Sequence, residues 1–218
     1  MIDEDDLTGD GVRELVTLSS DRLSVSVLHR SRETWNEHAF SVSTPAQHVL
    51  VADVNNDKRK DILLFGRKSA GIRTLLGRPN GSFRPGPLLF PDISVSDVKA
   101  IDFNGDGITD LILLNWLSNQ LVIFYGIGQG VFSEQITYDL PGEPDALAIA
   151  PASRLRSVSI AVTLPEEQDL LLLSRTAMGE VNVTRTLRCP STPTGVLYSF
   201  IDADEYPDVI SWTDQVVL

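Results

Sequence analysis

The sequence predicts an all-β protein built from repeats, and three observations support this prediction. Short runs of β-branched, aromatic and other apolar residues, separated by turn residues, cover nearly all of the 218 residues. Three nonapeptides rich in Asp, Asn and Gly follow one template and begin at residues 6, 53 and 102. Their starts lie 47 and then 49 residues apart, and a fixed period in this range indicates a solenoid, a propeller or another repeat array.

The clearest nonapeptide spans residues 102–110 (DFNGDGITD) and has oxygen-bearing side chains at its first, third, fifth and ninth positions. This spacing is typical of calcium sites, because Ca²⁺ takes six to eight oxygen ligands at about 2.3–2.6 Å. Gly107, at the sixth position, lets the backbone turn. An EF-hand is excluded, because Leu113 occupies the twelfth position, where a bidentate Glu is needed, and both flanks have the pattern of strands.

Two further nonapeptides repeat the template with substitutions. Residues 6–14 (DLTGDGVRE) carry Thr8 at the third position and Glu14 at the ninth, and residues 53–61 (DVNNDKRKD) carry Lys58 at the sixth, where Gly would turn more easily. A single loop of this kind would also fit ordinary turn chemistry, in which Asp, Asn and Gly are common. The recurrence at a fixed period favours metal binding.

The chain is strongly acidic. Its net charge is −12, which argues against a nucleic-acid partner because phosphates are bound mainly by Lys and Arg. The three nonapeptides hold nine carboxylates, so three bound Ca²⁺ ions would move the net charge from −12 to −6. We therefore expect much of the acidity to serve metal binding.

The sequence gives only indirect signs of cellular location. Cys189 is the single cysteine, so an internal disulfide is excluded, and we find neither a secretory signal nor an apolar run long enough to span a bilayer. Two sequons, at Asn80 and Asn182, permit glycosylation if the protein is exported. Because calcium sites of this kind fit a compartment with millimolar calcium, we expect an extracellular or cell-surface protein.

Four units of four strands are expected, with an acidic loop after the fourth strand of each. The expected strands are 14–19, 22–29, 35–43 and 47–53; 61–65, 71–76, 82–90 and 95–103; 110–114, 120–125, 131–140 and 145–150; and 157–164, 169–174, 180–187 and 195–201. Residues 209–212 and 215–218 would begin a fifth unit.

Glycines and aromatic residues recur at the same places in the units. Gly77, Gly81 and Phe83 reappear 49 residues later as Gly126, Gly130 and Phe132, Gly130 reappears as Gly179, and Trp35 takes the aromatic position of the first unit. We expect the glycines to form hairpins that need positive φ and the aromatic residues to pack between sheets. The run 126–130 is not a phosphate loop, because it precedes a strand and not a helix.

Two other loops depart from the template. Residues 150–157 contain no carboxylate, and Arg154 and Arg156 either replace the ion there or, as we favour, are simply solvated. Residues 202–208 begin 100 residues after Asp102 and are two residues shorter than the template, yet their acids could bind a metal.

The loops at 53–61 and 102–110, each followed by an apolar strand, resemble the FG-GAP/VCBS repeats of integrin-α-like β-propellers. This resemblance implies a β-propeller of four-stranded antiparallel blades over residues 1–218, with four complete blades plus part of another. It also implies that each calcium loop leads from the outer strand of one blade to the inner strand of the next. Such propellers commonly close with seven blades, so either this chain is a piece of a longer propeller, which we favour, or another chain or a second copy completes the ring.

The resemblance also implies a set of calcium ligands. Side chains supply most oxygens, and the residue at the seventh position supplies its carbonyl. The implied ligands are Asp6, Thr8, Asp10, Val12 and Glu14; Asp53, Asn55, Asp57, Arg59 and Asp61; Asp102, Asn104, Asp106, Ile108 and Asp110; and, in the short loop, Asp202, Asp204 and Asp208.

We expect a non-catalytic module that binds a protein or glycan and in which calcium is structural. The alternative is an accessory domain of a larger, carbohydrate-active enzyme. Catalysis is disfavoured because His29, His38 and His48 are scattered, Cys189 has no evident base, and no hydrolase or zinc-protease motif occurs. Trp116 and Trp212 end corresponding strands and either stack on a ligand or, as we favour, pack beneath a hairpin.

Overall fold

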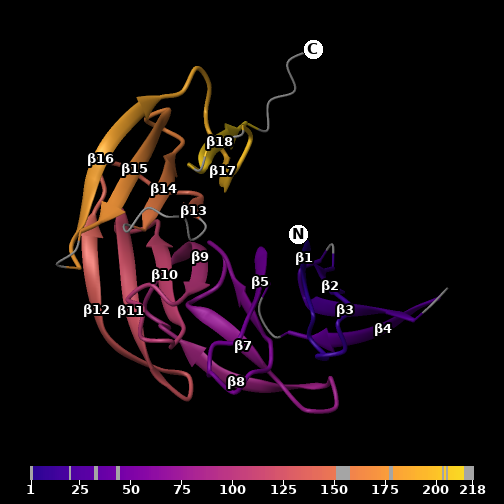
Figure 1. Cartoon of the computed structure of the whole chain (residues 1–218). Helices are drawn as coiled ribbons and strands as arrows, with labels where there is room; N and C mark the ends of the chain where they lie inside the picture. The colour runs from indigo at the N-terminus through magenta and orange to yellow at the C-terminus, as the bar shows by residue number, and fades with distance from the viewer. Residues whose placement is uncertain are drawn as a thin grey trace.

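The computed structural model (Figure 1) describes residues 2–19, 21–31, 34–42, 45–150, 158–176, 179–202, 204 and 206–213. These residues form eighteen strands and no helix, so the all-β prediction is confirmed. It follows that no helix in this part of the chain is long and apolar enough to cross a membrane.

The strands form four antiparallel sheets of four strands and one two-stranded hairpin. The sheets contain β1 (Ile2–Asp5), β2 (Glu14–Leu18), β3 (Ser24–Ser31) and β4 (Thr34–Ser41); β5 (His48–Ala52), β6 (Asp61–Phe65), β7 (Ile72–Gly77) and β8 (Phe83–Leu89); β9 (Val95–Ile101), β10 (Asp110–Asn115), β11 (Gln120–Gly128) and β12 (Val131–Asp139); and β13 (Leu147–Ile149), β14 (Ser159–Leu164), β15 (Asp169–Arg175) and β16 (Val181–Arg188). The hairpin contains β17 (Gly195–Ser199) and β18 (Asp208–Trp212).

The sheets are the blades of a β-propeller-like arc. The first strands of successive sheets contact one another, β1 with β5, β5 with β9, β9 with β13 and β13 with β17. Figure 1 shows these strands along the inner side of the arc, with β4, β8, β12 and β16 on the outside. Four complete blades and part of another are therefore present in the described chain, as predicted.

The blade boundaries differ from those expected. Each acidic loop joins the first and second strands of one sheet, and does not link two blades. His48 pairs with Phe65 and Ala52 with Asp61, so β5 belongs to the sheet that follows the first unit. The reason is geometric: a tight loop reverses the chain and returns it antiparallel onto the strand it has just left. The first blade is completed by β1, whose acidic sequence gave no strand signal.

The hydrophobic core lies between neighbouring blades, as β10 illustrates. Leu111 and Leu113 pack with the second blade, whereas Ile112 and Leu114 pack with the fourth. All four side chains are fully buried, because a strand in the middle of such a stack is covered on both faces. Burial of an aliphatic side chain contributes about 1.5–3 kcal/mol, so these joints supply much of the stability.

The aromatic position of the first blade was predicted incorrectly. Trp35 is 51% exposed and lies 5.9 Å below the Arg30 guanidinium, near the tip of the β3–β4 hairpin. Phe40 instead packs edge-on against Phe83 across the blade joint, with ring centroids 5.5 Å apart. The prediction failed because Trp35 lies at the end of β4 next to the hairpin turn, whereas Phe40, near the other end of β4, is the residue that reaches the second blade.

Polar contacts also tie the blades together. The carboxylate of Asp3 accepts a hydrogen bond from the Val51 amide at 2.6 Å, and that of Asp97 accepts one from the Leu147 amide at 2.8 Å. Both bonds connect the first strand of one blade to the first strand of the next, so they fix the spacing of the strands on the inner side of the arc.

On another part of the arc, Arg67 spans from the second blade to the fourth. Its guanidinium lies 4.9 Å from the ring centroid of Trp116 and pairs with Glu143 and Asp145. Trp116 is therefore half-buried beneath an arginine, which agrees with a packing role. Trp212 is 47% exposed and lines a cavity of about 250 Å³ bounded by the first strands of several blades.

Candidate metal-binding loops

Three acidic loops occupy equivalent places in the first three blades. Loop 1 (residues 6–14) joins β1 to β2, loop 2 (53–61) joins β5 to β6, and loop 3 (102–110) joins β9 to β10. In each loop the second residue points into the core between its own blade and the next, as Leu7, Val54 and Phe103 do. The loops are therefore anchored at the joints between blades.

The first residue of each loop closes the turn with its carboxylate. In loop 3, Asp102 Oδ1 accepts hydrogen bonds from the amides of Gly105 at 2.7 Å and Asp106 at 3.1 Å, and Oδ2 accepts one from Gly107 at 2.9 Å. Asp6 repeats the pattern. The hydrogen bond from the Gly11 amide lowers the pKa of the Asp6 carboxyl. Burial opposes this decrease, and the other amides of the loop add to it. Such a carboxylate is ionised at neutral pH.

The side chains of the third and fifth residues also accept hydrogen bonds from amides within the same turn. Asn104 Oδ1 accepts from the Asp106 amide at 2.9 Å, and Asp106 Oδ1 accepts from the Ile108 amide at 2.7 Å. Asn55 and Asp57 do the same in loop 2. A carboxylate or amide oxygen carries two lone pairs, so one backbone contact leaves each oxygen able to accept a further partner.

The ninth residue, which begins the second strand, carries a carboxylate that is fully buried in all three loops: Glu14, Asp61 and Asp110. One of its oxygens accepts a hydrogen bond from the amide of the second residue, at 2.7 Å in loop 1, 3.1 Å in loop 2 and 2.8 Å in loop 3. Each loop is thus closed by a buried acid that holds the backbone of the core-anchored residue.

In loops 2 and 3 the other oxygen of this acid is held by a glycine of the third strand. Gly77 donates to Asp61 Oδ1 and Gly126 donates to Asp110 Oδ1, both at 2.8 Å. A Cβ at these glycines would lie 2.4 Å and 2.3 Å from the carbonyl oxygens of Lys60 and Thr109. Close approach to the loop therefore requires glycine here. The prediction of positive φ was wrong for these two residues and is confirmed for Gly81, Gly130 and Gly179.

Burial disfavours the ionised form of two of these acids. Burial raises the pKa of Asp61 to about 6, and the negative charges of Asp57 and Asp53 add to the increase although two backbone amides oppose it. Burial also raises the pKa of Asp110, with a smaller contribution from Asp106. An all-oxygen donor set suits a hard divalent cation, so the residues of loops 2 and 3 fit Ca²⁺ in their chemistry. Loop 3 contains no basic residue, whereas in loop 2 the Asp57 carboxylate pairs with Arg59 at 3.5 Å, so part of the negative charge of loop 2 is balanced within the loop.

The side chains of the three loops converge to different degrees. In the described chain, the single group of three Asp, Glu, His or Cys ligand atoms that lie within 4.8 Å of one another is in loop 1, formed by Asp10, Glu14 and His29. In loops 2 and 3 the fifth-position acids, Asp57 and Asp106, are exposed, and among the described residues neither belongs to a group of three such ligand atoms.

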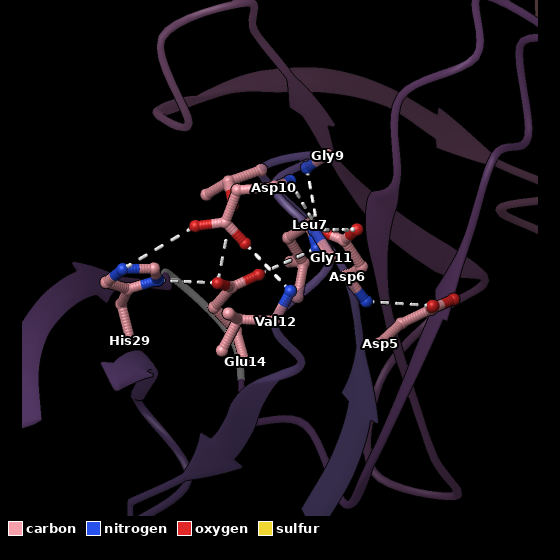
Figure 2. A network of polar contacts seen from close by, with 10 residues as sticks. Asp5, Asp6, Leu7, Gly9, Asp10, Gly11, Val12, Glu14 and His29 are labelled. Carbon is pink, nitrogen blue, oxygen red and sulfur yellow. Dashed lines mark hydrogen bonds and ion pairs between the residues drawn. The ribbon is translucent and has the colours of Figure 1, made fainter. Parts of the chain in front are cut away.

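His29 is the one site residue that the sequence did not indicate. It lies on β3, its Nδ1 is 2.6 Å from Glu14 Oε1, and its Nε2 is 4.0 Å from Asp10 Oδ2 (Figure 2). It follows Glu14 by 15 residues, whereas Gly77 and Gly126 follow their acids by 16. An imidazole ring therefore holds the buried acid in the first blade where a backbone amide does so in the next two.

The loop near the end of the chain follows the template in a different register from the one expected. The Ile201 amide donates to Asp208 Oδ2 at 3.0 Å, the Asp204 amide to Asp202 Oδ1 at 3.0 Å, and the Tyr206 amide to Asp204 Oδ1 at 2.8 Å. These bonds match those of loop 3 if the loop spans residues 200–208. It is then a full nonapeptide that begins 98 residues after residue 102.

In this register Asp202, Asp204 and Asp208 occupy the third, fifth and ninth positions, and Phe200 takes the place of the first acid. The prediction of a shortened loop was wrong because it placed the first acid, Asp202, at the first position of the template. The loop has to be aligned instead by its last acid, Asp208, which begins β18. The corresponding loop of the fourth blade, with Arg154 and Arg156, lies outside the described residues.

Neighbouring loops contact one another along the arc. The Asn56 side chain of loop 2 accepts from the Thr109 amide at 3.2 Å and donates to the Gly107 carbonyl at 3.4 Å in loop 3. Lys60 of loop 2 pairs with Asp5, which precedes loop 1, at 2.6 Å. The loops therefore form one continuous edge.

Comparison with known proteins identifies the class of repeat. Residues 53–113, which run from the start of loop 2 into β10, match the model of the FG-GAP-like repeat. This segment is therefore an FG-GAP-like repeat region, which confirms the resemblance seen in the sequence. No curated protein sequence matches the chain.

Solved structures with β-propeller-like folds resemble this chain at low identity. BBS1N, in complex with ARL6DN, has a TM-score of 0.64 and 13% identity over 90% of this chain and 58% of its own. A protein from Lactobacillus plantarum has a TM-score of 0.61 and 19% identity over 88% and 56%. The V. cholerae biofilm matrix protein Bap1 has a TM-score of 0.51 and 18% identity over 86% and 28%. The chain thus spans less than two thirds of each of these proteins, and the likeness concerns the fold.

Proposed function

We propose that this chain is a calcium-binding, non-catalytic β-propeller module that binds a protein or glycan, and that calcium is structural in it. The observation that supports this most directly is the recurrence of one hydrogen-bonded turn, closed by a buried carboxylate, at each of three blade joints. A cation at such a turn would neutralise the acids and hold the loop against the joint. The proposal includes that the protein acts outside the cell, where the calcium concentration is millimolar.

The residues proposed to hold the ion in loop 3 are Asp102, Asn104, Asp106 and Asp110, with the carbonyl of Ile108. Their equivalents serve in loop 2. Because the loop folds only when its strands pair, the ion binds the folded state and stabilises it by mass action. The buried acid positions the backbone, while the exposed fifth-position acid supplies charge.

The non-catalytic part of the proposal rests on the placement of reactive groups. His38 is exposed on β4. His48, on the inner strand β5, stacks against Phe65 of β6. Cys189 packs against the apolar cluster that joins the fourth blade to β17. His29 is committed to loop 1. None of these groups is seen to pair with a nucleophile within the described residues.

The nature of the ligand is proposed from the fold. BBS1N is described in complex with ARL6, so a structural neighbour of this chain is found in a protein complex. Propeller loops provide a broad edge for such contacts, and we propose a protein or glycan ligand for this chain as well. Completion of the ring by further blades of a longer chain, or by another copy, stays a prediction.

The test is thermal unfolding of the whole chain in excess EGTA and in about 10 mM CaCl₂. A site with a dissociation constant of about 0.1 mM would be stabilised by about 2.7 kcal/mol, which corresponds to an increase in Tm of about 5–10 °C. Asp106→Asn keeps the acceptor for the Ile108 amide but removes the charge, so it should reduce this increase. The control Asp92→Asn changes an exposed acid outside the loops and should not. An identical Tm with and without calcium would refute the proposal.

A further inference from the structure

Loop 1 differs from loops 2 and 3 in having a histidine beside its buried acid. The carboxylate of Glu14 is fully buried, and its Oε1 lies 2.6 Å from His29 Nδ1. Because a carboxylate can only accept, Nδ1 carries the proton in the neutral ring and Nε2 is left with a free lone pair. Figure 2 shows this nitrogen turned toward Asp10, whose Oδ2 is 4.0 Å away.

This arrangement is the one found around metal-bound histidines, in which the second ring nitrogen donates to a carboxylate that fixes the tautomer. Glu14 Oε1 and His29 Nδ1 are too close together for both to bind one ion, since two ligands at about 2.0–2.1 Å in tetrahedral geometry lie about 3.3 Å apart. The free Nε2 and Asp10 Oδ2 are therefore the ligand atoms, and Glu14 is the positioning residue.

The two ligand atoms need to approach by only about 0.7 Å to reach the spacing of a tetrahedral site. Asp10 can make this movement, because its side chain is 46% exposed and is held through Oδ1, which accepts from the Val12 amide at 2.9 Å. Glu14 cannot move as easily, because its other oxygen is bonded to the Leu7 amide at 2.7 Å in the core. The fixed half of the site is thus the histidine and the adjustable half is the exposed acid.

We propose that loop 1 binds a divalent transition metal ion of the zinc type, with His29 Nε2 and Asp10 Oδ2 as protein ligands and water in the open positions. Imidazole suits zinc and its neighbours in the first transition row, whereas calcium takes oxygen ligands. Loops 2 and 3 have only oxygen donors, so calcium remains the ion proposed for them. The inference rests on the proposed metal role of the loops but assigns a different ion to the first of them.

The test is calorimetric titration of the metal-free whole chain with ZnCl₂ in the presence of saturating calcium. All proteins carry Cys189→Ser, so that the thiol does not contribute. We expect one zinc site whose affinity falls at least tenfold in His29→Gln and in Asp10→Asn. The matched control is His38→Gln, which removes an exposed histidine of the same blade and should leave the affinity unchanged.

A second measurement identifies the ligand atom. Long-range ¹⁵N NMR of the imidazole rings should show that zinc shifts Nε2 of His29 while Nδ1 keeps its proton. The inference is overturned if zinc does not bind when calcium is saturating, if His29→Gln and His38→Gln bind zinc equally, or if Nδ1 is the nitrogen that shifts. The proposal for calcium is judged separately, because Asp106→Asn in loop 3 should weaken the calcium response and leave the zinc titration unchanged.

Discussion

Replacement of Gly126 by alanine is the most direct test of the way in which the third strand supports loop 3. The Gly126 amide donates to the buried Asp110 carboxylate at 2.8 Å, and a Cβ at this position would lie 2.3 Å from the Thr109 carbonyl and 2.8 Å from the Ile108 side chain. Contacts this short cannot be accommodated unless β11 moves away from the loop. That movement would also lengthen the hydrogen bond between the Gly126 amide and Asp110.

The expected cost follows from these two effects. Overpacking of a tight site costs typically 1–3 kcal/mol, and loss of a hydrogen bond to a charged group costs about 1.5–3 kcal/mol. We therefore expect Gly126→Ala to lower the free energy of unfolding by about 3–5 kcal/mol and the Tm by roughly 10 °C. Gly77→Ala should behave alike in loop 2, where the Cβ would lie 2.4 Å from the Lys60 carbonyl.

The measurement is urea unfolding of the whole chain, followed by tryptophan fluorescence and circular dichroism. The matched control is Gly105→Ala in the same loop, where a Cβ meets nothing within 4 Å and only the positive φ of 85° is unfavourable. That control should cost about 1 kcal/mol. If Gly126→Ala is no more destabilising than Gly105→Ala, the close approach of β11 to the loop does not govern its stability.

Three further predictions concern other parts of the chain. Lys58 has a φ of 67° where the equivalent residues are glycine, so Lys58→Gly should relieve about 1 kcal/mol of strain and raise the Tm by about 2–4 °C. Phe200→Asp restores the first acid of the last loop and should add one calcium ion per chain in equilibrium dialysis. Burial lowers the pKa of His48 below 6.5, against the opposing charges of Asp97 and Asp145, while Lys99 and Arg22 lower it further. As the pH falls, His48 is therefore protonated more readily in the unfolded chain than in the folded one, so the free energy of unfolding should decrease below about pH 6.5. Urea unfolding at pH 7.5 and 5.5 should show a smaller decrease for His48→Gln than for the wild type.

Each of these predictions has an outcome that contradicts it. An unchanged or lower Tm for Lys58→Gly would show that the side chain has a stabilising role that outweighs the strain. An unchanged calcium stoichiometry for Phe200→Asp would contradict the register assigned to residues 200–208. An equal loss of stability for wild type and His48→Gln between pH 7.5 and 5.5 would mean that other groups control the acid sensitivity.

The strands and the loop chemistry were predictable because both depend on short stretches of sequence. The runs around residues 61–65 and 110–114 are apolar enough to identify buried strands, and the spacing of acids in residues 102–110 reflects which side chains can hydrogen-bond their own turn. The repeat period then gave the number of blades. These features follow from local chemistry that is visible in the residue order.

The pairing of strands was not predictable in the same way. Whether residues 48–52 belong to the blade before or after them depends on which neighbouring strand supplies their hydrogen bonds, and in the structure that strand is β6 and not β4. The same holds for Trp35, whose exposure depends on the direction of a hairpin and not on its own sequence. The register of the last loop became clear from its hydrogen bonds, because its first acid is replaced by Phe200.

The sequence by itself determined that this is an acidic, all-β repeat protein with a recurring turn rich in Asp, Asn and Gly, because a tight turn is stabilised by residues within nine positions of one another. Only the tertiary structure decided which groups meet the buried acid at the end of each turn. Gly126 meets Asp110 from the third strand of the same sheet, and His29 meets Glu14 in the first blade. Such contacts join residues that are 15 or 16 positions apart through the pairing of strands, and the register of that pairing is set by packing between blades and not by the residues of the loop.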